Sequence, residues 1–90
     1  NLDYTLTTLY GMNKSQIREY KNAYNTYVLD EYLILESKKL TISEKKEKLM
    51  KANDDFCEKV KTFAPAETFN QWLGRRQYVF DRRMIQKGIR

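Results

Sequence analysis

The side chains with the most scope for chemistry lie in the last third of the chain, where arginines and aromatic residues are interspersed. They are Trp72, Arg75, Arg76, Tyr78, Phe80, Arg82 and Arg83. Guanidinium groups bind phosphates and carboxylates, and aromatic rings stack on bases or cover apolar side chains. The mixture therefore fits contact with another protein, an acidic membrane or nucleic acid. The simpler alternative is that cations near the C-terminus of a helix are favoured by the helix dipole.

The net charge of the chain arises entirely in the same segment. Residues 1–73 contain eleven Lys or Arg and eleven Asp or Glu, whereas residues 74–90 contain six and one. This excess accounts for the whole net charge of +5. Because no recognised nucleic-acid motif accompanies it, we expect proteins or unfolded polypeptides as partners in preference to nucleic acid.

Catalytic and metal-binding chemistry has little support in the sequence. The chain has no histidine and one cysteine, Cys57, which argues against zinc sites, catalytic triads and thiolate clusters. Asp54 and Asp55 are neighbours on an expected helix, so their carboxylates point in different directions. We therefore predict that the protein is not an enzyme and needs no cofactor or metal. Cys57 is expected to be a small buried apolar residue, with a disulfide between two chains as the alternative.

Three helix starts can be recognised from capping chemistry. Asn13 with Gln16, and Thr41 with Glu44, fit the capping box. Pro65 fits the first position of a helix. Each start opens a pattern of apolar residues spaced three and four apart, as an amphipathic helix requires.

These patterns predict an all-α fold with helices at about 3–10, 14–38, 42–62 and 65–86. The second and third have similar lengths and a short connection, so we expect a long antiparallel helical hairpin. A short N-terminal helix precedes it, and a basic C-terminal helix follows it. Ninety residues with short connections indicate a single domain, 1–90. No run approaches the roughly 20 apolar residues that span a bilayer.

The segment 27–35 is more apolar than one helix face requires. Seven of its nine residues are apolar, and a helix that is apolar on most sides is covered on most sides. The cover could come from other helices of the same chain. We favour a second copy of the chain, in a homodimer with Val28, Tyr32 and Leu35 at the interface.

Tyrosines lie along one face of the same predicted helix. Their large rings with polar ends suit a half-exposed contact surface, and the edge of a core is the alternative. Together with residues of the basic helix they form the predicted partner-binding set. Its members are Tyr20, Tyr24, Tyr27, Trp72, Arg75, Arg76, Arg82 and Arg83.

The three helix starts, in this order, resemble the Spy/CpxP-like periplasmic proteins, which carry Leu-Thr-x-x-Gln elements. The resemblance rests on Met12-Asn-Lys-Ser-Gln16, on Leu40-Thr-Ile-Ser-Glu-Lys-Lys46 and on Phe63-Ala-Pro-Ala-Glu67, and it covers about residues 9–75. Asn13 and Ala64 replace the threonine of the family pattern, and Glu67 replaces its second glutamine.

The resemblance implies a helical hairpin of the cell envelope, periplasmic or secreted after removal of a signal peptide. In this family such hairpins form cradle-like homodimers that bind unfolded proteins or sense envelope stress. A start at Asn1 without methionine agrees with processing of this kind. Two other functions remain open, a nucleic-acid-binding module that uses the basic helix and a structural subunit of a larger assembly.

Overall fold

Helices account for most of the chain. A computed structural model describes residues 1–89, and its elements are α1 (Leu2–Tyr10), α2 (Lys14–Glu36), α3 (Ile42–Lys61) and α4 (Ala66–Gln86). The all-α prediction is confirmed, and every predicted helix bound agrees to within two residues.

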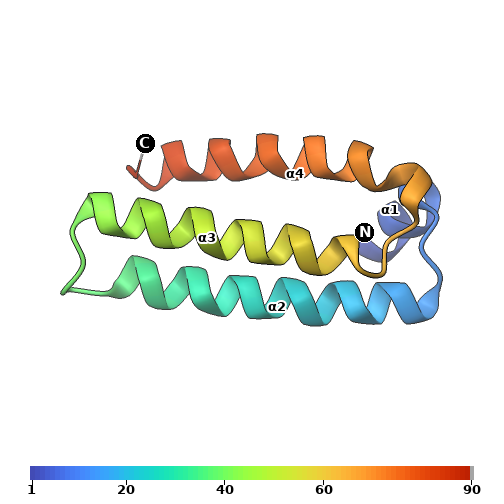
Figure 1. Cartoon of the computed structure of the whole chain (residues 1–90), viewed down its shortest axis with the longest axis horizontal. Coiled ribbons are helices and arrows are strands. Elements are labelled where there is room, and N and C mark those ends of the chain that lie inside the picture. Colours follow the sequence, from blue (N-terminus) through green and yellow to red (C-terminus); the bar gives the residue numbers. More distant parts are fainter. Residues whose placement is uncertain (90) are drawn as a thin grey trace.

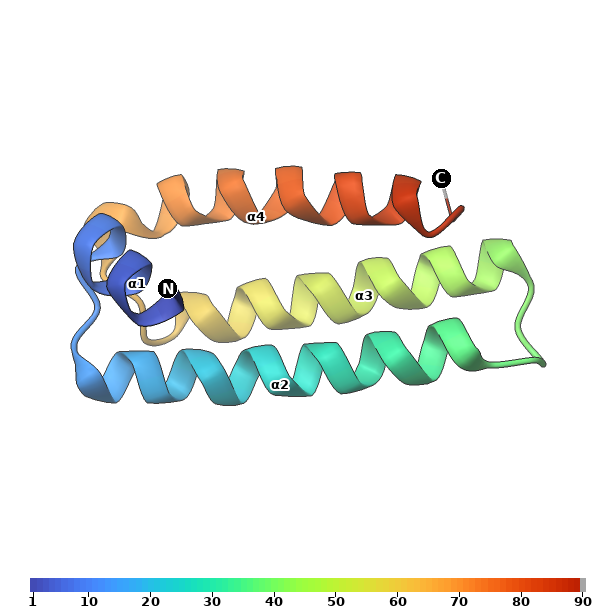
Figure 2. The same ribbon diagram turned by 180° about the vertical axis from the view of Figure 1, so that it is seen from behind.

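The three long helices lie side by side in one layer, with α3 in the middle (Figure 1). α2 and α3 form the predicted antiparallel hairpin, and α4 then returns along the other side of α3. No pair of Cα atoms within 8 Å joins α2 to α4 in the described chain. The short helix α1 lies against α2 and α4 at one end of this layer, on the side facing the viewer in Figure 2.

The capping boxes form as the sequence predicts. The side chain of Asn13 accepts from the Gln16 N–H at 2.9 Å, and the Gln16 side chain accepts from the Asn13 N–H at 2.8 Å. Thr41 and Glu44 make the same reciprocal pair at 3.1 and 2.9 Å. These bonds satisfy N–H groups that have no partner inside the helix, and so fix where α2 and α3 begin.

The start of α4 differs from the prediction by one residue. Pro65 has φ −58° and ψ 129°, so it is the extended residue before the helix and Ala66 is the first helical residue. No side chain caps this end. The connection is held by other polar contacts, because the Gln16 amide donates to the Phe63 carbonyl at 2.8 Å.

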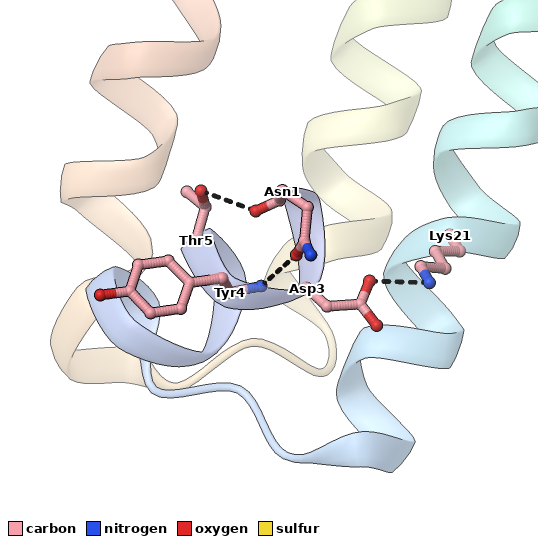
Figure 3. A network of polar contacts seen from close by, with 5 residues as sticks. All are labelled: Asn1, Asp3, Tyr4, Thr5 and Lys21. Atoms are coloured by element: carbon pink, nitrogen blue, oxygen red, sulfur yellow. Dashed lines mark hydrogen bonds and ion pairs between the residues drawn. The ribbon is translucent and has the colours of Figure 1, made fainter.

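The helix α1 is tied to both of its neighbours. Asp3 forms a 2.7 Å ion pair with Lys21 of α2, as Figure 3 shows. The Thr68 hydroxyl of α4 donates to the Tyr10 carbonyl at 2.7 Å. Gly11 closes the helix at φ 69°, a left-handed conformation that favours glycine.

The core runs along α3, where its two neighbours meet it. The largest fully buried side chains are Leu6, Leu49, Val60 and Met84. Cys57 is also buried and carries a free thiol, and burial raises its pKa. This agrees with the expectation that Cys57 is a small apolar residue of the core.

Removing the cap of α3 is expected to cost about 1 kcal/mol in the free energy of unfolding, because Thr41→Ala leaves the Glu44 N–H without its acceptor. For a domain of this size the midpoint of thermal unfolding should fall by about 4–8 °C. Circular dichroism measures this. Thr26→Ala, a threonine in the middle of α2 whose hydroxyl only bonds back to Asn22, is the matched control. Equal midpoints for the two variants would contradict the capping argument.

Candidate partner-binding surface

The structure divides the predicted partner-binding set into two groups. Four of the eight side chains are buried, namely Tyr20, Tyr27, Trp72 and Arg76. They pack inside the helix layer and offer no surface to a partner in this conformation. The other four, Tyr24, Arg75, Arg82 and Arg83, are exposed.

The buried aromatic residues gather around Phe56 of α3. Ring centroids of Tyr20, Tyr27 and Trp72 lie 5.6, 5.7 and 5.5 Å from that of Phe56. The Trp72 indole N–H donates to the Tyr20 hydroxyl at 3.3 Å. Side chains of α2 and α4 thus meet over α3, although the two helices do not touch through their backbones. The cluster explains why these tyrosines belong to the core and not to a half-exposed face.

A buried cation lies beside this cluster. The Arg76 side chain is 8% exposed, and its Nε donates to Asn53 Oδ1 at 2.7 Å. Its guanidinium carbon is 4.4 Å from the ring centroid of Tyr27 and 4.9 Å from that of Phe56. Aromatic faces and one amide oxygen therefore replace the water that a surface arginine would have.

Besides the hydrogen bond between Trp72 and Tyr20, an ion pair joins α2 to α4. Glu31 is buried, and its carboxylate accepts from the guanidinium of Arg83, which is half exposed. The side chain of Glu31 therefore points toward α4. This contact also removes Arg83 from the set of cations that are free to bind a partner.

Large apolar side chains remain exposed on α2. Val28, Leu29, Tyr32 and Leu33 are 43, 58, 61 and 58% exposed, and Leu35 is half buried. Within the segment 27–35, Arg76 and Arg83 of α4 cover Tyr27 and Glu31, but the apolar side chains from Val28 to Leu33 stay exposed. The other helices of the same chain therefore cover this segment only in part.

Three of these residues, Val28, Tyr32 and Leu35, lie on the side of α2 that faces α4. Tyr24 and Glu31 face α4, since Tyr24 lines a cavity with α4 residues and Glu31 pairs with Arg83. Val28 is four residues after Tyr24 and three before Glu31, so helical spacing places it on the same side. Tyr32 follows Val28 by four residues and Leu35 follows Glu31 by four, so both also lie on this side. Leu33 instead lines a depression against α3.

Across from these α2 residues, the surface is formed by α4 and is basic. Arg75 and Val79 line the cavity together with Tyr24, and Arg82 follows Val79 by three residues on the same side. We call the whole surface the α2–α4 face. It consists of Tyr24, Val28, Tyr32 and Leu35 on α2, and of Arg75, Val79, Arg82 and Arg83 on α4.

The helix α1 covers only one end of the α2–α4 face. Where it ends, a cavity of about 420 Å³ opens between α1, α2 and α4. Leu2, Tyr24 and Val79 are among the residues that line it. Beyond the cavity no helix of the described chain lies over the face (Figure 2).

Glu31 and Asn53 do not belong to the predicted partner-binding set, although both make buried polar contacts with α4. The sequence does mark these positions, because Asn53 and Arg76 occupy core positions in the apolar patterns of their helices, and Glu31 lies four residues after Tyr27 on α2. A polar residue at such a position needs a buried partner. The pattern identifies the position, but the partner lies on a different helix and becomes visible only in the fold.

The Tyr27 hydroxyl suggests a test of this buried region. It is buried without a well-formed hydrogen bond. Loss of hydration and, second, the nearby Glu31 carboxylate raise its pKa well above the ordinary value of 10.0. The folded state therefore holds this proton more tightly than the unfolded state, so stability is full below about pH 10 and falls above it.

We expect Tyr27→Phe to keep the stability of the parent near pH 7 and to lose less of it above pH 10. Urea unfolding at pH 8 and at pH 10.5 measures this, and the exposed Tyr32→Phe is the control. A loss at high pH that is the same in all three proteins would show that Tyr27 does not contribute.

Residues 1–89 contain no group of three or more His, Cys, Asp or Glu side chains placed to hold a metal ion. No helix in that part of the chain is long and apolar enough to cross a membrane. Comparisons of the chain with protein-family models, curated proteins and solved structures find no match.

Proposed function

We propose that this chain binds other polypeptides through the α2–α4 face and acts by contact, as a chaperone-like or stress-related protein of the cell envelope. The observation that carries the proposal is the exposed apolar row on α2 beside the arginines of α4. The envelope location rests on the resemblance to Spy/CpxP-like proteins.

An exposed apolar row of this kind is informative because of its continuity. Single apolar side chains on a surface are ordinary, but a contiguous patch marks a contact site. Val28 and Tyr32 are separated by one turn, so their side chains lie next to each other. The arginines beside them supply a positive field that draws acidic polypeptides toward the patch.

The first experiment is a client assay. A chemically denatured client protein is diluted into buffer with and without a molar excess of the chain, and light scattering records aggregation. We expect the chain to suppress aggregation and Tyr32→Ser to weaken this effect. Unchanged aggregation at molar excess would reject the proposed function.

A second copy of the chain is one candidate to cover the face, because the predicted interface residues Val28, Tyr32 and Leu35 lie on it. The solution mass from multi-angle light scattering tests this. A dimer that Tyr32→Ser dissociates supports the homodimer. If the parent chain and Tyr32→Ser are both monomers, the homodimer is rejected and the face is free for another polypeptide.

The nucleic-acid alternative has weaker support. Of the four arginines near Trp72, Arg76 is buried and Arg83 pairs with Glu31. Arg75 and Arg82 remain for phosphates, which is few for a site whose affinity comes from counterion release. A gel-shift series with single-stranded DNA at low salt tests this alternative, and the absence of a shift would dismiss it.

A further inference from the structure

We propose that the open part of the α2–α4 face binds a short amphipathic helix that is acidic along one edge and belongs to another polypeptide. This inference rests on the proposed function and names the class of segment that is bound.

The chain itself shows that this side of the layer accepts a helix. α1 lies against both α2 and α4 and buries Leu6 and Tyr10. Its carboxylate Asp3 meets Lys21 of α2 at 2.7 Å (Figure 3). A two-turn amphipathic helix with an acidic residue is therefore the kind of ligand that already occupies the covered end.

The open part continues this contact without a break. Tyr24 and Val79 line the cavity under the edge of α1, and Val28 follows Tyr24 by one helical turn. From Val28 to Leu35 the α2 backbone rises by about 10 Å at 1.5 Å per residue, which leaves room for about two turns of a bound helix. Apolar side chains of that helix would pack on Val28, Tyr32 and Leu35.

The exposed charges of the face indicate which side chains the bound helix should carry where it meets α4. Arg75 and Arg82 are exposed on α4, and Arg82 forms no ion pair within residues 1–89. The buried carboxylate of Glu31, which lies beside the face, is already paired with Arg83. Carboxylates on the edge of the bound helix that meets α4 would complement the two remaining arginines.

The same charges disfavour a second copy of the chain as the occupant. A twofold pairing would bring identical faces together. Each copy would then offer two exposed arginines, and the face offers no free carboxylate to meet them. An acidic helix from a different polypeptide satisfies both the apolar and the basic wall.

The test uses a fluorescein-labelled synthetic peptide of about 16 residues, long enough to form a helix on binding. Leucines spaced three and four apart form one face, glutamates form the neighbouring edge, and alanines fill the rest. One control peptide carries lysine in place of glutamate. A second has the same composition in an order without helical periodicity. Fluorescence anisotropy with the full chain measures binding.

We expect the acidic peptide to bind with a Kd in the micromolar range. Arg75→Glu with Arg82→Glu, and separately Tyr32→Ser, should each raise Kd by at least about tenfold. Lys48→Glu and Leu33→Ser are matched controls, because both residues are exposed and line the depression against α3. The controls should change Kd by less than about twofold. All variants change exposed side chains, and circular dichroism confirms that they fold.

Each other outcome overturns the inference. Equal binding of the acidic, lysine and reordered peptides would show that the chain does not select an acidic amphipathic helix. Equal effects of the test and control variants would show that the α2–α4 face is not the binding site. If the chain suppresses client aggregation but ignores the acidic peptide, the inference fails while the proposed function stands. If it does neither, both fail. A stable homodimer that buries Tyr32 would identify a second copy as the occupant.

Discussion

Phe56→Ala is expected to lower the free energy of unfolding by about 3–5 kcal/mol, the usual cost of deleting a buried phenylalanine side chain. The ring is buried and contacts aromatic side chains from both outer helices. Since α2 and α4 do not touch through their backbones, the cavity would open where the two helices are joined. Small domains are stable by about 5–15 kcal/mol in total, so the variant should be close to unfolding at 37 °C.

Urea unfolding followed by circular dichroism measures this effect. Phe69→Ala is the control, because Phe69 is half buried and its ring pairs with Trp72, at 5.9 Å between centroids, and not with Phe56. We expect the control to lose clearly less stability. If both variants lose the same amount, Phe56 is not the central contact of the layer.

The second large effect is expected at Asn53. In Asn53→Leu the buried guanidinium of Arg76 loses the acceptor that lies 2.7 Å from its Nε. A buried charge without a partner costs more than the lost hydrogen bond, so we expect a loss of about 2–4 kcal/mol. The double variant Asn53→Leu with Arg76→Met removes the charge as well and should recover at least about 1 kcal/mol of that loss.

Chemical denaturation of the parent, the two single variants and the double variant forms a complete cycle. Arg75→Met is the matched control, because this arginine is exposed and should change stability by no more than about 0.5 kcal/mol. A double variant that is less stable than Asn53→Leu would show that the aromatic rings alone stabilise the charge of Arg76. The link to Asn53 would then be a minor one.

The helix starts could be predicted from sequence because capping is local. Asn13 with Gln16, and Thr41 with Glu44, are three residues apart, so one short stretch contains the whole interaction. The spacing of apolar residues three and four apart is equally local, because it lies within a single helix. The start of α4 was placed one residue too early, since Pro65 fits both the first helical position and the extended residue before it.

The division between core and surface could not be read in the same way. Tyr20, Tyr24 and Tyr27 share a helix face, yet Tyr24 is exposed and the other two are buried. The difference arises because α3 lies under one side of that face and α1 covers only part of the other. Such positions depend on contacts more than 20 residues apart in sequence, as with Trp72 and Tyr20.

The helix α1 contacts one helix that is near to it in the sequence, α2, and one that is far from it, α4. This difference affects the order in which the chain assembles. The α2–α3 hairpin forms from neighbouring segments, which is kinetically fast. α1 meets α4 across 58 residues, as in the bond from Thr68 to Tyr10, so this contact can form only after α4 has docked. Because α1 is the shortest helix of residues 1–89, we expect it to detach first in the native state and its amide hydrogens to exchange with solvent before those of α3. When α1 detaches, the whole length of the α2–α4 face is uncovered.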